Sequence, residues 1–258
     1  MKEKTAQRMQ AALVTGAGKR IGRFMAEALA EDGWFVYVHY NASRAEASQT
    51  VAAIKKAGGQ AKAVRADLSN AQATEALIGQ CQTGPKLTCL VNCASLFELD
   101  RPGSFNAAAW DKHQAINLRA PAILARDFAK QLGAKHTGCI VNLLDQKLWN
   151  LNPDFYSYTV SKIALSGVTE ILARALAPKI RVNAIAPGIT LPAAKQNKKN
   201  FHAAQARAPL GIGATPADLV RALRFILATP SLTGETIIVD GGEHLGKRPG
   251  DVMFENKT

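Results

Sequence analysis

Short apolar runs alternate with amphipathic helical patterns along the whole of this 258-residue chain, and this alternation limits the possible folds most strongly. Strands that alternate with helices in this way are typical of a parallel sheet covered by helices on both faces. The sequence therefore predicts an α/β fold with a doubly wound, seven-stranded parallel sheet. The expected strands span residues 11–15, 34–40, 61–66, 87–92, 140–144, 179–186 and 236–239.

One domain over residues 1–258 is expected, because hydrophobic residues make up 47% of the chain and no linker-like change of composition interrupts it. Residues 189–215 have no clear hydrophobic period and carry a run of lysines, so we interpret them as a mobile substrate lid. The expected helices span residues 20–32, 44–57, 71–82, 110–132, 156–177 and 216–228.

Composition excludes several classes of function. The net charge is +12, but Lys and Arg are spread along the chain without interleaved aromatic residues, which argues against nucleic-acid binding. No apolar run approaches the ~18 residues that a membrane-spanning helix needs. The four cysteines lack the spacing of zinc ligands and fit reduced core residues, so no metal is expected. A charged N-terminus without a long apolar segment completes the prediction of a cytoplasmic protein.

A glycine-rich turn follows the first expected strand and opens the first expected helix. Gly16, Gly18 and Gly22 give the spacing G-x-G-x-x-x-G, and Arg20 stands at a position that is often glycine in the related pattern T-G-x-x-x-G-x-G. Glycines let the backbone approach a phosphate, and a helix N-terminus offers free N–H groups and the positive end of its dipole. The turn therefore predicts a dinucleotide phosphate site.

The end of the second expected strand indicates which dinucleotide binds. An acid here would bind the ribose 2′-hydroxyl of NAD, and the sequence instead has Tyr40, Asn41, Ser43 and Arg44, with Lys19 expected nearby. An acid would repel a 2′-phosphate by about 4 kcal/mol per charge pair at 4 Å, whereas these groups attract it. The expected cofactor is NADP(H), although Arg44 also fits the plain start of a helix.

Polar and small residues also follow the third and fourth expected strands. Asp67 can accept from the adenine amino group, or it can cap the helix that follows, for which Ser69 competes. Small residues at 93–95 leave room for a cofactor against the backbone. Phe97 on the same loop can stack on a flat ring, but it also fits a core position.

A polar interruption is expected inside the helical region 110–132, because it contains Asn117 and Pro121. Proline removes a helical hydrogen bond, and asparagine favours caps and turns over helix interiors. We therefore expect a kink near the middle of this region, at a place where Asn117 can have a special role.

Residues 140–162 hold the candidate chemistry. A buried strand runs into Asp145, and the helix that begins near residue 156 carries Tyr158 and Lys162 four positions apart, on one face. A lysine beside a phenol favours the phenolate and lowers its pKa, which makes Tyr158 a candidate proton donor or acceptor. Taken alone, Tyr-x-x-x-Lys also fits a solvated helix face, and Asp145 also fits a capping acid.

These motifs, in this order, resemble the short-chain dehydrogenase/reductase family over nearly the whole chain. The resemblance implies a single-domain Rossmann fold. Asp145 replaces the usual catalytic serine thirteen residues before Tyr158. This departure, together with Lys19-Arg20 and Ser95-Leu-Phe97, resembles the pteridine reductases and the dihydromonapterin reductases. The matching pieces are Thr15-Gly16-Ala-Gly-Lys-Arg-Ile-Gly22, Asp67-Leu68, Asn92-Cys-Ala-Ser95, Asn117, Tyr158-x-x-x-Lys162, Pro187-Gly188 and Asp240-Gly-Gly.

The resemblance also implies roles for single residues. Asp145, Tyr158, Lys162 and Asn117 would be catalytic, with Asn117 holding a water. The ring of Phe97 would stack the pterin against the nicotinamide. The implied cofactor-binding residues are Gly16, Lys19, Arg20, Ile21, Tyr40, Asn41, Ser43, Asp67, Leu68, Asn92, Ala94, Ser95, Tyr158, Lys162, Pro187 and Gly188. The implied substrate-binding residues are Arg20, Ser95, Phe97, Asp145 and Tyr158. Relatives are commonly tetramers, so a homotetramer is expected.

The expected activity is hydride transfer from NADPH to a C=N bond of a dihydropterin, such as dihydrobiopterin or dihydromonapterin. A carboxyl at position 145 suits the ring nitrogens and amides of a pterin better than a carbonyl oxygen, which a serine hydroxyl would polarise. Two alternatives stay open. One is a carbonyl reductase, such as a 3-oxoacyl-thioester reductase, and the other is an NADP-binding sensor without catalysis.

Overall fold

The computed structural model describes residues 9–192, 198–246 and 249–251. Within these residues the strands form one seven-stranded parallel sheet in the order β3-β2-β1-β4-β5-β6-β7, which confirms the predicted doubly wound α/β fold. The strands are β1 Ala11–Val14, β2 Phe35–Tyr40, β3 Gln60–Arg65, β4 Leu87–Asn92, β5 Gly138–Leu143, β6 Ile180–Pro187 and β7 Thr236–Val239.

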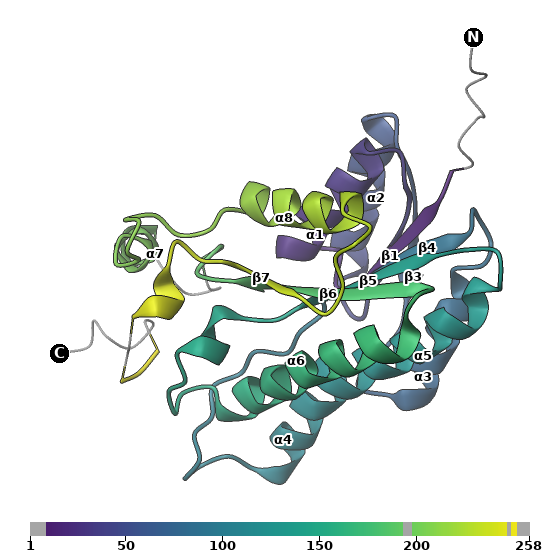
Figure 1. Cartoon of the computed structure of the whole chain (residues 1–258). Helices are drawn as coiled ribbons and strands as arrows, with labels where there is room; N and C mark the ends of the chain where they lie inside the picture. Colours follow the sequence, from purple (N-terminus) through teal and green to yellow (C-terminus); the bar gives the residue numbers. More distant parts are fainter. Residues whose placement is uncertain (1–8, 193–197, 247–248, 252–258) are drawn as a thin grey trace.

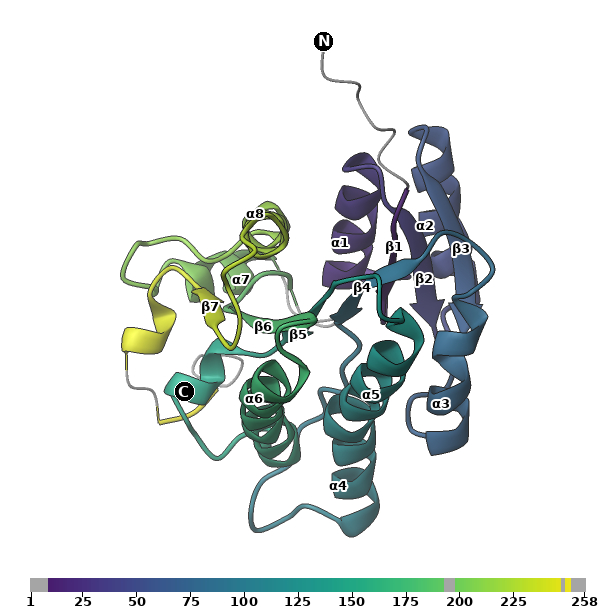
Figure 2. The same ribbon diagram turned by 45° about the vertical axis from the view of Figure 1, so that its right-hand side comes forward.

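Helices cover both faces of the sheet. In Figure 1, α1, α2 and α8 lie on one face, and α3, α4, α5 and α6 lie on the other. Figure 2 shows β3 and β7 at opposite edges of the sheet. The helices of the two layers are α1 Arg20–Glu31, α2 Arg44–Lys56, α3 Ala71–Gln80, α4 Ala107–Gln114, α5 Ala120–Leu132, α6 Tyr156–Leu176 and α8 Pro216–Ala228.

Side chains of β1 alternate between two hydrophobic cores, one on each face of the sheet. Successive residues of a strand point to opposite faces, so Val14 packs on the side of α1 and α8 while Leu13 packs on the side of α3 and α5. Both side chains are fully buried. A strand buried on both faces explains why β1 reads as a continuous apolar run.

The chain builds the sheet outward from the inner strand β1, first to one side and then to the other. From β1 it proceeds outward through β2 to β3, then returns to β4 on the other side of β1. Ligands of such sheets bind beyond the strand carboxyl ends at this switch point. The segments after β1 and β4 flank this switch point, and the segment after β5 lies next to them.

The predicted interruption of the helical region 110–132 is confirmed. Between α4 and α5, the segment η1 Ala115–Arg119 is π-helical, and the N–H of Ala120 donates to the carbonyl oxygen of Ala115. Pro121 lies in the first turn of α5, where the missing N–H of a proline costs little. Asn117 is thus in the middle of the widened turn.

Residues 189–215, which have no clear hydrophobic period, contain a helix that was not predicted. They include α7 Lys198–Gln205, whose Phe201 and Ala204 are buried. The side-chain amide of Gln205 donates to Ile189 O at 2.8 Å and to Ala214 O at 3.2 Å, which ties the helix to both ends of the segment. Residues 193–197, which include Lys195 at the start of the lysine run, lie outside the described residues. The role of this segment as a mobile lid stays a prediction.

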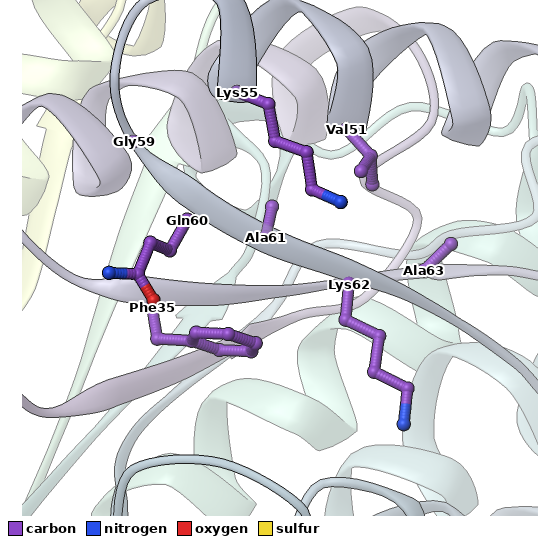
Figure 3. A pocket seen from close by; sticks show the side chains of 8 residues that line it. All are labelled: Phe35, Val51, Lys55, Gly59, Gln60, Ala61, Lys62 and Ala63. Atoms are coloured by element: carbon purple, nitrogen blue, oxygen red, sulfur yellow. The ribbon is translucent and has the colours of Figure 1, made fainter.

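A shallow hollow at the edge of the sheet lies between β3 and α2 (Figure 3). Lys55 projects from the helix and Lys62 from the edge strand. Lysines on an edge strand oppose pairing with a second chain, so this hollow fits a protected sheet edge.

Among the described helices, none is both long and apolar enough to cross a membrane.

Candidate active site

The turn after β1 is built on close backbone contacts with the segment after β4. Gly16 has φ +66°, and a Cβ at this position would lie 2.9 Å from Ala94 Cα. The hydroxyl of Thr15 accepts hydrogen bonds from the N–H groups of Cys93 (2.9 Å) and Ala94 (3.0 Å). Only glycine combines this conformation with this approach, so Gly16 fixes the turn against β4. The sequence motif contained Thr15, but its bridging role was not predicted.

The N-terminus of α1 faces this turn without a side-chain cap. Among the described residues, the Lys19 side chain makes no capping hydrogen bond, and the first turn of α1 contains no acid. Free N–H groups and the positive end of the helix dipole favour an anion at this point. The predicted phosphate site is thus compatible with the local structure.

Arg20 occupies the position that is often glycine, and its backbone explains why. Its φ is +55°, in the left-handed region that favours glycine. The guanidinium donates to the carbonyl oxygens of Pro192 (2.9 Å) and Leu191 (3.5 Å). Arg20 therefore joins the phosphate turn to the beginning of the segment 189–215. Its contacts with cofactor and substrate stay predictions.

His39 holds the turn from the side of β2, and sequence reasoning missed it. Its Nδ1 accepts from the N–H of Gly16 at 3.1 Å, and its Nε2 lies 3.1 Å from Ala66 O. Because a carbonyl only accepts, Nε2 carries the proton and the imidazole is neutral. Burial lowers the pKa of His39 to about 4. A single histidine inside an apolar strand was the available signal.

The ends of β2 and β3 bring cations to the predicted 2′-phosphate position. Lys19, Asn41 and Arg44 are exposed, and Tyr40 is half-buried. Arg65, next to Tyr40 in the sheet register, donates to Asn41 O at 3.3 Å and adds a cation that was not predicted. Ser43 is the N-cap residue of α2, and among the described residues its side chain makes no capping hydrogen bond.

Both alternatives for capping α3 were wrong. Asn70 is the N-cap, and its side chain accepts from the N–H of Ala73 at 2.9 Å. Asp67 instead accepts from the N–H (2.9 Å) and the hydroxyl (2.7 Å) of Ser69, and these hydrogen bonds lower the pKa of its carboxyl. Asp67 is therefore a fixed, ionised acceptor after β3, and its contact with adenine stays a prediction.

Some of the predicted cofactor-binding residues have side chains that are turned away from solvent. Asn92 is buried in the sheet, where its amide donates to Asn142 Oδ1 at 2.8 Å. Leu68 and Pro187 are also buried. Any contact of these three with a cofactor falls mainly to the main chain. Ile21, Ala94 and Gly188 are half-buried, and Ser95 is exposed.

The catalytic candidates Asp145 and Tyr158 are in direct contact. The Tyr158 hydroxyl donates to Asp145 Oδ2 at 2.6 Å. The other carboxylate oxygen accepts from the N–H of Lys147 at 2.9 Å, at the start of the 3₁₀ helix η2 Gln146–Trp149. Tyr158 is buried and Asp145 is half-buried. The end of β5 and the first turn of α6 thus place an acid and a phenol side by side.

The prediction that Lys162 lowers the pKa of Tyr158 was wrong. Burial, followed by the carboxylate of Asp145, raises the pKa of Tyr158 well above its ordinary value. Lys162 Nζ donates to Leu143 O at 2.6 Å and lies 5.8 Å from the centroid of the Tyr158 ring. Burial lowers the pKa of Lys162 to about 8 and raises that of Asp145. Tyr158 is therefore held protonated.

The loop that carries Phe97 is held on both sides by the α4–η1 region. Asn117 accepts from the N–H of Leu96 at 2.8 Å and donates to Leu96 O at 3.0 Å. On the other side, the N–H of Glu98 donates to His113 Nε2 at 3.3 Å. His113 is buried and was not predicted. Asn117 therefore positions the loop that carries Phe97, and its role in holding a water stays a prediction.

Phe97 is not a core residue: its ring is exposed on one side and packs against two other aromatic rings on the other. It is 45% exposed. Its ring stacks on Phe155, with centroids 4.0 Å apart and planes 13° apart, and it meets the Tyr158 ring edge-on at 4.7 Å. Phe155 has φ +56°, which strains a non-glycine residue. Sequence reasoning missed Phe155, because an aromatic residue before a helix has no distinctive pattern.

The fold and these contacts together define a class of protein. An open helix N-terminus after the first strand of a parallel sheet, with a phenol, a lysine and an acid beside the switch point, is typical of nucleotide-dependent oxidoreductases. In the described part of the chain, no three His, Cys, Asp or Glu residues are grouped as ligands for a metal ion.

Comparison with known proteins agrees with this class. The chain belongs to the short chain dehydrogenase family, whose model matches residues 10–203. The crystal structure of the FolM alternative dihydrofolate reductase 1 from Brucella canis, complexed with NADP, superimposes with a TM-score of 0.89. It shares 41% sequence identity and the match covers 94% of this chain and 96% of that one.

Curated relatives with similar sequences are also oxidoreductases. An uncharacterized oxidoreductase of Methylorubrum extorquens is 33% identical, over 90% of this chain and 96% of its own length. The 3-oxoacyl-[acyl-carrier-protein] reductase of a Synechocystis species is 31% identical, over 92% of this chain and 98% of its own. The family is thus established, and the relatives differ in the substrates that their names give.

Proposed function

We propose that this protein is an NADPH-dependent reductase that converts a dihydropterin to a tetrahydropterin. The observation that carries the proposal is the 2.6 Å hydrogen bond from the Tyr158 hydroxyl to the carboxylate of Asp145. The similarity to the FolM alternative dihydrofolate reductase 1, with 41% identity and NADP in its structure, supports both the substrate class and the cofactor.

The residues at the nucleotide side fit NADP(H). A side chain at Gly16 would fill the space at the turn, and the uncapped N-terminus of α1 suits a pyrophosphate. Lys19, Arg44 and Arg65 supply positive charge for a 2′-phosphate. When bound, the reduced nicotinamide supplies the hydride. Lys162, fixed by Leu143 O, would hold the nicotinamide ribose.

Phe97 would present its exposed ring to the flat substrate. Asn117 and His113 fix the residues on either side of Phe97, and Phe155 supports its ring from below, so the ring is preorganised for stacking. Aromatic stacking of this kind contributes about 0.5–1.5 kcal/mol beyond the buried area. The substrate would thus lie between Phe97 and the nicotinamide.

Tyr158 and Asp145 would supply the proton that accompanies the hydride. The carbon of the C=N bond receives the hydride with its electron pair, and the nitrogen receives the proton. Tyr158 is held protonated by burial and by its acidic neighbour, and burial raises the pKa of Asp145. A proton kept between a phenol and a carboxyl beside the substrate suits this step.

Asp145 also favours a pterin over a ketone. A carboxylate can accept hydrogen bonds from the N–H groups of a pterin, whereas negative charge that develops on a carbonyl oxygen needs a donor. In the protonated form, a carboxyl with a raised pKa can also donate. One residue therefore serves both the donors and the acceptors of a nitrogen heterocycle.

NADPH oxidation with a substrate panel tests the proposal. Dihydrobiopterin, dihydromonapterin and dihydrofolate should be reduced, and methotrexate should inhibit. Acetoacetyl-CoA is the matched comparison, because the similarity to a 3-oxoacyl-[acyl-carrier-protein] reductase favours a carbonyl substrate as the second candidate. Turnover of acetoacetyl-CoA alone would exclude a pterin reductase. NADPH binding without any turnover would favour the sensor.

A further inference from the structure

Lys147 is a buried lysine on the loop of the proposed catalytic acid Asp145, and the proposed reaction does not use its side chain. It follows Asp145 by two positions, and its N–H donates to Asp145 Oδ1 at 2.9 Å. Only 4% of the residue is exposed. An ammonium group in such a place costs several kcal/mol unless it is paired and hydrogen-bonded.

In the described part of the chain, three groups contact the ammonium of Lys147. Its Nζ donates to Asn152 Oδ1 at 2.5 Å, lies 3.3 Å from Asp251 Oδ2 and lies 5.6 Å from the centroid of the Phe155 ring. Asn152 and Phe155 belong to the connection between η2 and α6. The ammonium therefore holds residues 147, 152 and 155 together, and the ring of Phe155 in turn stacks on Phe97.

Asp251 comes from the far end of the chain, 104 positions after Lys147. Its N–H donates to Asp154 Oδ2 at 2.9 Å, and Asp154 in turn pairs with Arg101 Nε at 2.7 Å. The described C-terminal residues are thus attached to the loop after β5 and, through Arg101, to the loop after β4. These two loops carry Asp145 and Phe97.

The same charges act on the catalytic pair. Burial raises the pKa of Asp145, while the charges of Lys162 and Lys147 oppose that rise. Burial and the Asp145 carboxylate raise the pKa of Tyr158, and the charge of Asp251 adds to them. Lys147 and Asp251 therefore act with opposite sign on proton transfer at the site.

We propose that Lys147 is a positioning residue of this oxidoreductase, and that its ion pair makes Asp251 part of the active site. Lys147 fixes the carboxylate of Asp145 through its backbone N–H and the 145–155 connection through its side chain. The ion pair between Lys147 and Asp251 also keeps a positive and a negative charge together near the Asp145–Tyr158 pair, so that their effects on its pKa values oppose each other. Both residues would act in the same way whether the substrate is a pterin or a ketone.

The test compares Lys147→Met, Lys147→Arg and Asp251→Asn, with Lys130→Met as the control at an exposed lysine on α5. The activity readout is the pH profile of kcat with dihydrobiopterin or acetoacetyl-CoA, whichever the wild type reduces. The affinity for NADPH and the hydrogen exchange of residues 145–155 are measured on the same proteins.

Loss of the ammonium should lower kcat of Lys147→Met by about tenfold or more, with NADPH affinity nearly unchanged. The apparent pKa of the Asp145–Tyr158 pair should rise in Lys147→Met and fall in Asp251→Asn, because charges of opposite sign are removed. Lys147→Arg should restore most of the activity, and Lys130→Met should behave as the wild type.

Shifts of the same direction in Lys147→Met and Asp251→Asn, or unchanged profiles in both, would overturn the inference. If Lys147→Met does not fold, Asp251→Asn decides by the sign of its shift. If the wild type reduces neither substrate, the proposed function fails separately. Hydrogen exchange then decides, since both variants should accelerate exchange of residues 145–155 while Lys130→Met should not.

Discussion

The predicted nucleotide side of this site, around Gly16, and its proposed catalytic side, around Asp145 and Tyr158, are held together by different forces. Around the glycine-rich turn, Thr15 and His39 fix the backbone with neutral hydrogen bonds, and the close approach of Gly16 to Ala94 sets the spacing. After β5, the half-buried carboxyl of Asp145 accepts from the Tyr158 hydroxyl, and the buried ammonium of Lys147 pairs with Asp251. The geometry of the glycine-rich turn thus depends on close backbone packing, and that of the segment after β5 depends on ionisable side chains.

This difference separates binding from chemistry. A neutral, close-packed turn keeps its geometry across the physiological pH range, because the pKa of His39 lies at about 4. The proposed catalytic side has shifted pKa values, including about 8 for Lys162, and so responds to pH near neutrality. Substitutions on the first side should affect cofactor affinity, and those on the second should affect turnover.

The largest effect is expected at Asp145. Asp145→Ala removes the acceptor of the Tyr158 hydroxyl, and kcat should fall by about 10²–10⁴ because a proton-transfer partner is lost. NADPH affinity, measured by fluorescence titration, should stay nearly unchanged. Asp111→Ala, at an exposed acid of α4, is the control. Unchanged turnover in Asp145→Ala would remove its assigned role.

A comparable loss should appear on the nucleotide side, but in binding. Gly16→Ala places a methyl group 2.9 Å from Ala94 Cα at φ +66°. Strain of about 1–3 kcal/mol should weaken NADPH binding by about 10–100-fold, while saturating NADPH restores most of kcat. Gly103→Ala is the control, since among the described residues no heavy atom lies within 4 Å of its added Cβ. An equal loss of kcat at saturation would contradict the division.

The stability of the nucleotide side should depend on pH through His39. Its pKa is lowered from 6.5 to about 4, so between these values the unfolded chain binds more protons. The free energy of unfolding should therefore rise with pH from 4 to 6.5, by about 3 kcal/mol from this group.

Urea unfolding at a series of pH values measures this contribution. His39→Gln should lose most of the slope below pH 6.5, and His136→Gln, at an exposed histidine, should keep it. The same slope in all three proteins would mean that other groups carry the dependence.

The smallest effect is expected at Phe97. Phe97→Ala removes a stacking surface and leaves the Asp145–Tyr158 contact in place. KM for a dihydropterin should rise by about 3–10-fold, with a smaller change in kcat. Phe225→Ala, at a 54% exposed ring of α8, is the control. A fall in kcat without a rise in KM would argue against stacking.

Most of the fold could be predicted from the sequence, because parallel strands buried on both faces are apolar runs with clear limits. The bounds of β4, α8 and β7 agree with the prediction to the residue. Helix α7 was missed because only one of its turns is buried in the body, through Phe201 and Ala204, and lysines precede them.

The site could be predicted only as far as sequence order implies position. Strand ends bring Gly16, Asp145 and the Tyr158 helix to one edge, whatever the details of packing. The pKa of Tyr158 could not be predicted, because spacing along a helix does not reveal that Lys162 points to Leu143 O. His39, Phe155 and Lys147 were missed because their partners are distant in sequence or defined by backbone conformation.

The widened turn at Ala115–Arg119 has a consequence for how the α4–α5 region tolerates change. A π turn holds one residue more than the α-helical turn it replaces, so deletion of residue 116 would allow a continuous α-helix. The faces of α4 and α5 would then keep their relative orientation, because the π turn absorbs the extra residue without turning one helix against the other. His113 would stay beside Glu98, whereas Asn117 would lose the widened turn from which its amide reaches the main chain of Leu96. A single missing codon would thus release one side of the loop that carries Phe97, while the helices beneath it kept their packing.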